Sequence, residues 1–460
     1  MAQHGYIALP PDGAGKKLHA HYQNVQGEDV YNQIMNLGDP EHFDQIAKVG
    51  PDKALYIRFA EGSQQFNAFG DSKVAQETTL GQYVPFYDLL PEDVQTFEYG
   101  TSEQTACSKG NGSSVIMTIG TAPGDMLVRE THKKHLLNYG SSQLVNLSIT
   151  LTDAGKQNVR KRVGYFSEED GAYFEQTEAG LAVGRRSSMS GSPVDFVVPR
   201  SEWDDPMDGT GESRFNLIEN FSNNFWIDVQ QNLGRIRWGV QDSTDRRVVA
   251  HTFSPVSQGV GGVFATCSLP LRWEIENTGT SPSISQLRIG PAFVVSEGYQ
   301  LPTGVARTAM PPEAVTIQDT PTHIWSMRLK AQFKNKVNYM AVVPKQASVH
   351  TGGEPVVIML VKNATLTGAE WNVDVGEHSG VEGTVVGTCD CTGPTPTGQV
   401  VASSITSGGD VDFSQFFDYL GEYLRLRADG TSDTYSLVAK TLTAATTADV
   451  FSTLTWKELS

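Results

Sequence analysis

One group of candidate metal ligands in this sequence is the acidic run Asp204–Asp208. Carboxylates at alternate positions of a short loop are the ligands that calcium takes in helix–loop–helix sites. A loop of about twelve residues that begins at Asp204 places Pro206 at the third position and Phe215 at the last, where that site needs a Glu. The template therefore fails. A calcium loop of another kind stays open, and a turn whose Asp side chains cap backbone amides is the default expectation.

Templates for phosphate and nucleophilic chemistry also fail at particular positions. Gly13–Lys17 is similar to a phosphate-binding loop, but Pro10 stands where the first glycine belongs, and a lysine replaces the final hydroxyl. The Gly-x-Ser-x-Gly turn of many hydrolases does not occur in the sequence. Glycoside hydrolysis needs two carboxylates that face each other in space, so the sequence leaves that chemistry open.

Histidine and cysteine spacings give no recognisable metal site. The close pairs His19/His21 and His132/His135 have no Asp, Glu or Cys ligand at metal spacing, which predicts surface histidines. The four cysteines form no CxxC pair and are expected to be reduced thiols. The sequence therefore predicts no catalytic residue, no cofactor and no metal ligand.

Tryptophans are the side chains here that could stack on sugars. Trp203 and Trp371 lie outside the alternating patterns and are the two candidates for glycan contact. The other five sit within alternating segments and are expected in cores: Trp226, Trp238, Trp273, Trp325 and Trp456.

Composition limits the partners. The 460 residues carry 35 basic and 52 acidic side chains, a net charge of −17. A phosphate backbone needs a basic footprint, so nucleic acid is not expected as a partner. The short basic patch Arg160–Arg162 is interpreted as a solvated strand edge or an inter-subunit contact. No apolar run reaches the ~18 residues of a membrane helix, and no secretory signal is visible at Met1–Gly15.

The elements that must position these residues are mostly strands. In Leu271–Glu276 one face is Leu, Trp and Ile and the other is Arg, Glu and Glu, which predicts a half-buried strand with Trp273 and Ile275 in the core. Glu168–Gly171 reads as a hairpin turn. Further strands are expected at Gln143–Thr150, Phe225–Val229, Arg235–Val240, Arg247–Phe253, Leu287–Val295, His323–Phe333, Val337–Val343, Pro355–Lys362, Glu422–Arg427, Thr434–Ala439 and Val450–Glu458. Short helical patterns occupy Glu28–Leu37, Pro40–Val49 and Val411–Leu420.

These patterns predict a mostly β fold with two antiparallel, jelly-roll-like β-sandwiches behind an irregular α+β N-terminal arm. We expect the arm at residues 1–120, ending at the glycine-rich joint Gly110–Ser114. The first sandwich is expected at 121–305 and the second at 323–460. The proline-bearing stretch 306–322 is predicted to be a linker.

Nine passages of the chain carry a resemblance to a known family: Arg160–Phe166, Asp170–Glu175, Arg186–Ser192, Phe225–Asp228, Leu233–Val240, Ala250–Phe253, Leu269–Asn277, Val294–Gly298 and Leu454–Leu459. These passages resemble structural proteins of tailed bacteriophages, a largely uncharacterised family of tail, fibre or appendage type. The resemblance covers residues 125–300 best and 320–460 more loosely. It implies a jelly-roll-type sandwich in the middle of the chain and a place in the virion.

The leading expectation is therefore a non-enzymatic virion structural protein, assembled in the host bacterial cytoplasm through sandwich faces as a tail, fibre or collar component. Its partners would be other virion proteins and copies of itself. A capsid decoration protein is the runner-up within this class. The alternatives from other classes are a module that binds host surface glycan and a glycan-cleaving enzyme with two facing carboxylates.

Overall fold

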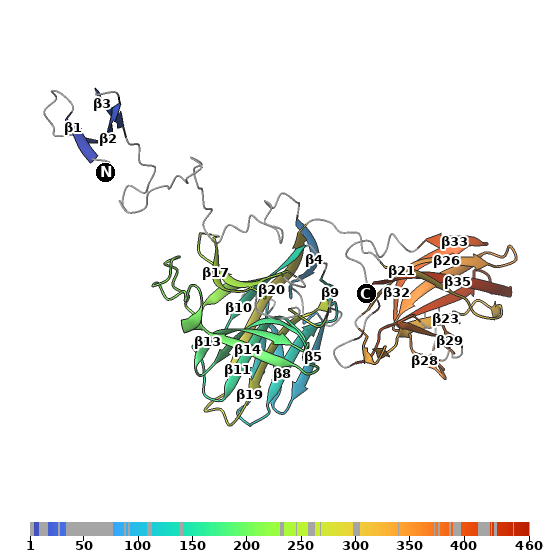
Figure 1. Ribbon diagram of the computed structural model, residues 1–460. Coiled ribbons are helices and arrows are strands. Elements are labelled where there is room, and N and C mark those ends of the chain that lie inside the picture. Colours follow the sequence, from blue (N-terminus) through green and yellow to red (C-terminus); the bar gives the residue numbers. More distant parts are fainter. Residues whose placement is uncertain are drawn as a thin grey trace. The chain divides into compact units, whose positions relative to one another are not determined.

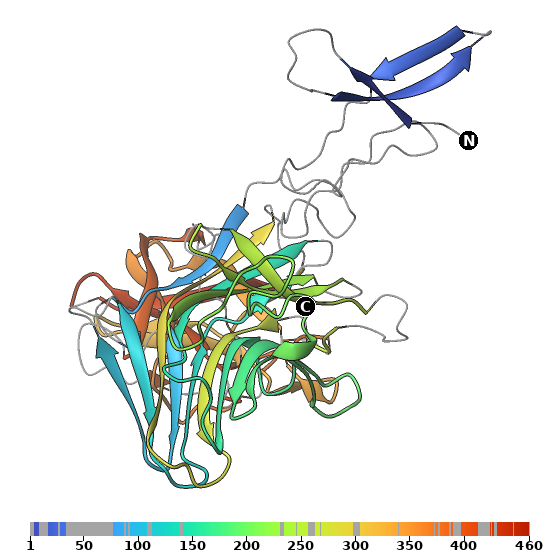
Figure 2. The ribbon, with the colours of Figure 1, turned by 90° about the vertical axis from the view of Figure 1, so that its left-hand side faces the viewer.

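The structure is a computed structural model of the chain. It describes residues 4–8, 17–25, 28–33, 77–86, 89–90, 93–107, 113–137, 141–230, 234–244, 246–255, 263–266, 268–297, 304–338, 340–371, 373–375, 378–385, 388–389, 397–412, 424, 426, 430–444 and 446–459. The chain divides into two compact units, Met1–Ser63 and Gln64–Ser460. The first contains a small antiparallel sheet of β1 (His4–Ala8), β2 (Lys17–Val25) and β3 (Glu28–Gln33), drawn in blue in Figure 2.

The first sandwich of the second unit consists of two antiparallel sheets, which Figure 1 shows as an upper and a lower layer. The eight-stranded sheet has the order β17-β16-β15-β10-β20-β7-β6, and β4 pairs with the far end of β20. Its strands are β4 (Glu77–Tyr83), β6 (Ser102–Cys107), β7 (Ser114–Ile119), β10 (Ser142–Thr150), β15 (Ser222–Gln230), β16 (Ile236–Gln241), β17 (Arg247–Phe253) and β20 (Ser285–Glu297).

The seven-stranded sheet has the order β14-β13-β12-β11-β19-β8-β5. Its strands are β5 (Val94–Tyr99), β8 (Met126–Thr131), β11 (Val159–Phe166), β12 (Gly171–Thr177), β13 (Gly180–Ser187), β14 (Val194–Pro199) and β19 (Leu271–Asn277). A short ladder of β9 (His135–Leu136) with β18 (Ser268–Leu269) and the 3-10 turn η1 (Arg200–Glu202) complete this sandwich.

The core of the first sandwich lies between its two sheets. Phe174 on β12 meets Phe225 on β15 with ring centroids 4.8 Å apart, so the contact joins the two layers. Trp273 and Ile275 lie in this core, and their neighbours Arg272 and Glu274 point to the opposite face of β19. The side-chain alternation expected for this strand is confirmed, but the strand is not half-buried, since Arg272 and Glu274 are 4% and 3% exposed.

The second sandwich packs a five-stranded sheet, β21-β35-β26-β33 with β22 beside β35, against a six-stranded sheet, β29-β30-β23-β34-β27-β32. Trp325 on β23 stacks on Trp456 on β35 at 5.7 Å in its core. The strands are β21 (Val305–Ala309), β22 (Val315–Ile317), β23 (Thr322–Leu329), β26 (Ala341–His350), β27 (Val356–Lys362), β29 (Val373–Asp374), β30 (Val381–Thr384), β32 (Gln399–Thr406), β33 (Gly409–Asp412), β34 (Thr434–Thr441) and β35 (Ala448–Leu459). Two small ladders join β24 (Gln332–Phe333) to β25 (Lys336–Val337) and β28 (Leu366–Thr367) to β31 (Thr388–Cys389).

The expected mostly β fold with two antiparallel sandwiches is confirmed, but two predicted domain boundaries are wrong. The N-terminal arm does not extend to residue 120, because β4 to β7 hydrogen-bond into the sheets of the first sandwich. The glycine-rich joint Gly110–Ser114 connects the paired strands β6 and β7 and does not separate domains. Residues 306–322 are not a linker, since they contribute β21 and β22, which both pair with β35.

The predictions of helices were less accurate than the predictions of strands. Residues 28–33 form β3, where antiparallel pairing with β2 overrides the local helical spacing. Val411 and Asp412 belong to β33, and the rest of Val411–Leu420 lies outside the described residues, as does Pro40–Val49. Of the strand expected at 422–427, the structure describes Leu424 and Leu426, and each forms an isolated bridge. Within the described ranges, no helix is long and apolar enough to cross a membrane.

Candidate functional site

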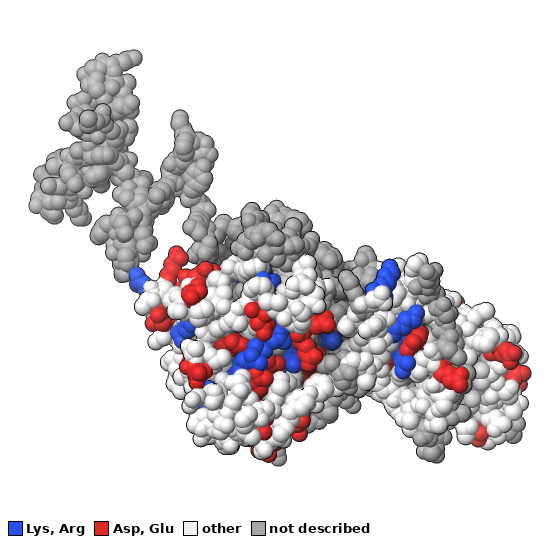
Figure 3. Space-filling model, turned by 60° about the horizontal axis from the view of Figure 1, so that its bottom comes forward, with Lys and Arg blue, Asp and Glu red and all other residues white. Residues whose placement is uncertain are grey.

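The outer face of the seven-stranded sheet gathers charged side chains, and we call it the charged face. Figure 3 shows lysine and arginine atoms in the middle of this region, surrounded by carboxylates. Because alternate residues of a strand point to opposite faces, every second residue belongs here while its neighbours enter the core. The members are Glu130, Arg160, Arg162, Glu175, Arg186, Asp195, Arg272, Glu274 and Glu276. Four arginines meet five carboxylates, so this face is close to neutral.

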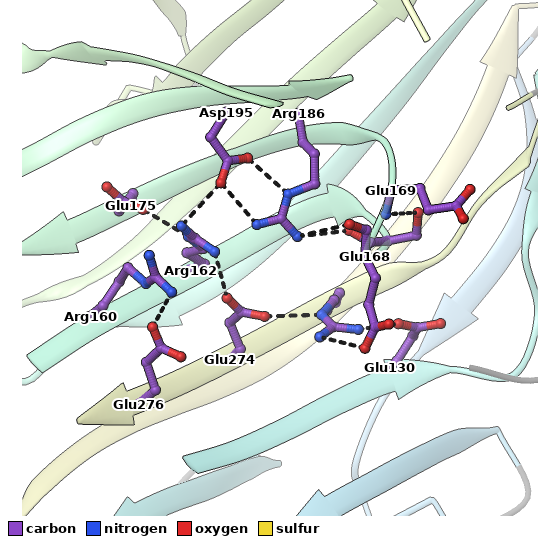
Figure 4. Close-up of polar contacts among 12 residues, drawn as sticks. Glu130, Arg160, Arg162, Glu168, Glu169, Glu175, Arg186, Asp195, Glu274 and Glu276 are labelled. Atoms are coloured by element: carbon purple, nitrogen blue, oxygen red, sulfur yellow. Dashed lines mark hydrogen bonds and ion pairs between the residues drawn. The ribbon is translucent and has the colours of Figure 1, made fainter. Parts of the chain in front are cut away.

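Strand register places opposite charges side by side. Arg162 on β11 lies directly opposite Glu175 on β12 and Glu274 on β19. Arg272 on β19 lies opposite Glu130 on β8. Directly opposed residues on one face of an antiparallel sheet are close enough for their side chains to interact. The ladder pairing therefore accounts for the Arg162–Glu175, Arg162–Glu274 and Arg272–Glu130 contacts drawn in Figure 4.

Arg162 is the first node of this network. It donates to Glu175 at 2.7 Å, to Glu274 at 3.1 Å and to Asp195 at 3.4 Å. The side chain of Arg162 is 5% exposed and that of Glu274 is 3% exposed. Coulomb attraction at such depth is screened much less than at the surface, so these contacts are stronger than ordinary surface ion pairs.

Arg272 is the second node and shares Glu274 with the first. It donates to Glu130 at 2.8 Å and to Glu274 at 3.1 Å, and lies 3.8 Å from the exposed Glu168. Burial acts to lower the pKa of Arg272, but the charges of Glu274 and Glu130 outweigh it and raise the pKa. Arg272 therefore stays charged at any physiological pH.

The carboxylates of the charged face differ in their environments. Burial raises the pKa of the Glu130 carboxyl above its usual range, and the charge of Arg272 offsets this only in part. Burial acts in the same direction on Asp195, but its hydrogen bond with Arg186 and the charges of Arg186 and Arg162 lower its pKa overall. Arg186 donates to both oxygens of Asp195, at 2.8 and 3.1 Å.

Tyr173 lies beside the arginines of the charged face, and glycines leave room for its ring. A Cβ atom on Gly184 would lie 2.2 Å from the ring of Tyr173, and one on Gly164 would lie 2.6 Å from the Cα atom of Tyr173. The Arg162 guanidinium is 5.2 Å from the ring centroid. Burial raises the pKa of the Tyr173 phenol, which is therefore neutral. A side chain at position 184 would displace this ring.

All five carboxylates of the charged face contact a guanidinium within 3.5 Å. A glycosidase-type pair needs one carboxyl that gives a proton and one that acts as a base or nucleophile. Here each carboxylate is instead paired with at least one arginine, which gives the sheet a polar, charge-paired surface. The arrangement fits recognition or packing better than proton transfer.

Strand β14 forms the end of this sheet and is joined to the charged face through Asp195. Its other side chains are unusually apolar for an edge: Val194, Phe196 and Val197 are 39%, 50% and 43% exposed. Pairing with β13 is continuous from Val194 to Pro199, without a bulge. The far side of β14 therefore presents a regular backbone edge flanked by apolar side chains.

The two tryptophans that the sequence suggested for glycan contact are not equivalent. The candidate Trp203 is not available for glycan contact, since it is 5% exposed, packs edge-on against Phe174 and donates to the carbonyl of Val198 at 3.0 Å. Trp371 is partly exposed, and the Arg328 guanidinium lies 4.3 Å from its ring centroid. A sugar contact at Trp371 stays a prediction. The five tryptophans expected in cores are all buried, although Trp226 packs with Leu144 and Val295 outside the main core.

The acidic run Asp204–Asp208 adopts the default arrangement. Asp205 accepts hydrogen bonds from the backbone amides of Met207 at 2.9 Å and Ser213 at 2.8 Å. Asp208 accepts from the amide of Thr210 at 2.9 Å. These carboxylates cap turns in the loop before β15. Among the described residues, no three His, Cys, Asp or Glu side chains are grouped to hold a metal ion.

Two other expectations need correction. His135 is not a surface residue: it is buried, and its Nε2 atom is hydrogen-bonded to the Tyr83 hydroxyl at 3.1 Å. The basic patch Arg160–Arg162 is not at a sheet edge, because β11 lies between β12 and β19. Lys161 points to the core side and reaches Asp153 at 2.8 Å. The patch is divided between the two faces of a central strand.

No protein-family model matches the chain, and no curated protein matches it. Solved structures with a similar course include the carbohydrate recognition domain of Emp47p, at 10% identity over 50% of this chain and 100% of that one, with a TM-score of 0.32. The Mycobacterium tuberculosis protein Rv0315, titled an immunostimulatory antigen and pseudo β-1,3-glucanase, is 6% identical over 50% of this chain and 100% of its own, with a TM-score of 0.32. SO2946 from Shewanella oneidensis MR-1, of unknown function, is 9% identical over 51% and 92%, with a TM-score of 0.34. Likeness at this level identifies neither a ligand nor a reaction.

Proposed function

We propose that this protein is a non-enzymatic structural component of a tailed-phage virion and that it assembles through the edge strand β14. The observation that carries the proposal is the apolar, regular edge formed by Val194, Phe196 and Val197. Natural proteins usually protect such an edge with lysines, bulges or a covering segment, because it is a template for pairing with another chain. Among the described residues, the devices present at β14 are its terminal Pro199 and the charge of Asp195.

A second copy of the chain is the occupant that this edge fits. Antiparallel pairing of β14 with β14 of another copy would extend the seven-stranded sheet across a two-fold axis, the commonest symmetry of homo-oligomers. Burying the Asp195 carboxylate in such an interface would cost little free energy, because Arg186 and Arg162 already neutralise its charge within its own sheet. The interface would bury apolar side chains at its centre and keep its charges paired.

The phage setting rests on the sequence resemblance of the passages within 160–300, and the fold is compatible with it. A tail, fibre or collar position is our first choice and a capsid decoration protein the second. Electron microscopy and mass spectrometry of purified particles would test the setting. Absence of this chain from particles of the phage that encodes it would refute a virion role.

The assembly edge is tested separately by light scattering during size-exclusion chromatography of the full chain. We expect the wild type to form dimers or larger oligomers at tens of micromolar and the variant Val194→Lys/Val197→Lys to be monomeric. Ile284→Lys is the matched control, since Ile284 is an exposed aliphatic residue in the loop before β20. A monomeric wild type, or a double variant that assembles like the control, would refute the β14 interface.

A further inference from the structure

A polar groove crosses the outer face of the eight-stranded sheet in the first sandwich. Its volume is about 720 Å³, within the range of sites that hold small ligands. Strands β10, β15, β16 and β20 form its floor, and the segment that precedes β15 forms one wall. The floor is lined by hydroxyl and amide side chains, chiefly Ser148, Thr150, Ser222, Asn224 and Gln241.

The polar side chains of the floor are held in place by one another. Ser148 donates to the Asn224 side-chain oxygen at 2.8 Å, and the Asn224 amide lies 3.5 Å from the Gln241 oxygen. The hydroxyls of Thr150 and Ser222 are 2.7 Å apart. All of these side chains stand on paired strands, so their positions are fixed before any ligand arrives. Preorganised donors and acceptors lose little freedom on binding.

The wall of the groove adds an apolar element. Phe221 is 60% exposed and Ile218 is 46% exposed, and both line the groove. The Asn223 amide donates to the carbonyls of Ile218 and Phe221, at 2.9 Å each, and so fixes this segment beside the floor. An exposed aromatic ring held next to hydroxyl and amide groups can cover the apolar C–H face of a sugar ring while the floor binds its hydroxyls.

The charges around the groove favour an uncharged ligand. Arg288 and Asp242 both line it and carry opposite charges. The side-chain hydrogen bond from Thr244, which outweighs the opposing effect of burial, lowers the pKa of Asp242 to about 2, so this carboxylate stays ionised. A polyanion would be repelled by the Asp242 carboxylate and by the net charge of −17 on the chain. Hydroxyl and acetamido groups match the floor without such a penalty.

We propose that this groove binds a neutral oligosaccharide, with Phe221 as the stacking platform and Asn224 and Gln241 as hydrogen-bonding partners. The site differs from the one that the tryptophans suggested, and it shares no residue with β14. The proposal of glycan binding in the groove and the proposal of assembly through β14 can therefore be refuted independently of each other.

Binding would be measured with the full chain on a printed array of neutral hexose and N-acetylhexosamine oligosaccharides. Uronic-acid oligosaccharides and a deoxythymidine 20-mer would be included. The strongest ligand would then be titrated by calorimetry. We expect Phe221→Ala and Gln241→Ala each to weaken binding about tenfold or more, the loss of roughly 1.4 kcal/mol. Phe86→Ala is the matched control, because Phe86 is 55% exposed and does not line the groove.

Three results would overturn the proposal. The first is an array without any neutral oligosaccharide bound. The second is a preference for the uronic-acid probes or the deoxythymidine 20-mer. The third is binding that Phe221→Ala weakens no more than Phe86→Ala does. Because Phe221 is exposed, its alanine variant is expected to fold, and an unchanged circular dichroism spectrum would confirm this.

Discussion

Replacing Arg162 with Met removes the cation that Glu175, Glu274 and Asp195 share. Breaking a buried ion pair by removing one partner costs about 3–5 kcal/mol, because a buried charge is left without compensation. Glu274 keeps Arg272 and Asp195 keeps Arg186, which places the expected loss near the lower end, at about 3 kcal/mol. A loss of about 3 kcal/mol raises the equilibrium constant for opening of the first sandwich roughly a hundredfold.

The chain has two sandwiches, so a single unfolding curve would mix their transitions. Hydrogen exchange followed by mass spectrometry on peptides from β11 and β19 reports the free energy of opening of the first sandwich alone. Arg160→Met is the control, because its side chain is 32% exposed and pairs with Glu276; a loss of about 0–1 kcal/mol is expected there. The double variant Arg162→Met/Glu175→Gln should recover part of the loss, since it removes the stranded charge.

Two results would refute this reasoning. If Arg162→Met and Arg160→Met cost the same, burial does not strengthen the network. If the double variant is less stable than Arg162→Met, the stranded carboxylate is not the source of the loss. The first result would mean that these ion pairs contribute no more to stability than ordinary surface ion pairs do.

Three further predictions concern the first sandwich. Glu130→Gln should raise stability at pH 7 and lose that gain near pH 4: the folded-state pKa of Glu130 is raised above its unfolded value, so ionisation costs stability as pH rises through it, which hydrogen exchange of peptides from β8 at both pH values would check. Asp170→Ala should cost about 3 kcal/mol in the same assay, since its carboxylate accepts from three backbone amides and the Ser188 hydroxyl at 2.9–3.2 Å, and a loss below about 1 kcal/mol would contradict this. Gly184→Ala should lower the free energy of opening of β13, followed by hydrogen exchange, because it displaces the Tyr173 ring. Gly191→Ala, with nothing near its Cβ position but φ at +98°, should show only the cost of its backbone conformation.

The sequence predicted the strands well where one face is apolar and the other polar. In β19 the alternation assigned both faces correctly, because burial of one face and period-two geometry act on each residue in the same way. It failed at the domain boundaries, since β4 and β21 join their sheets only through pairing with distant strands, β20 and β35. Pairing at long sequence separation leaves no local signal.

The candidate sites were harder to predict for the same reason. The Arg and Glu residues of β11 and β19 were visible in the sequence, but the register that makes them partners was not. Trp203 was a candidate for glycan contact because it lies outside the alternating patterns, yet its indole fills the core beside Phe174. The groove combines residues 148, 224 and 241, which meet only when β10, β15 and β16 are adjacent.

The charged face also explains how a sheet with a polar outer side keeps one register. A slip of β11 by one residue would turn Arg162 into the core and Val163 outward, and would remove the cation opposite Glu274. The cost of burying an unpaired guanidinium makes that alternative far less stable than the native pairing. Since Arg162 also contacts Asp195, the same network fixes the edge strand β14 to the sheet. A chain that assembles through β14 needs that edge to be rigid before it meets a partner, because ordering it on contact would weaken the association.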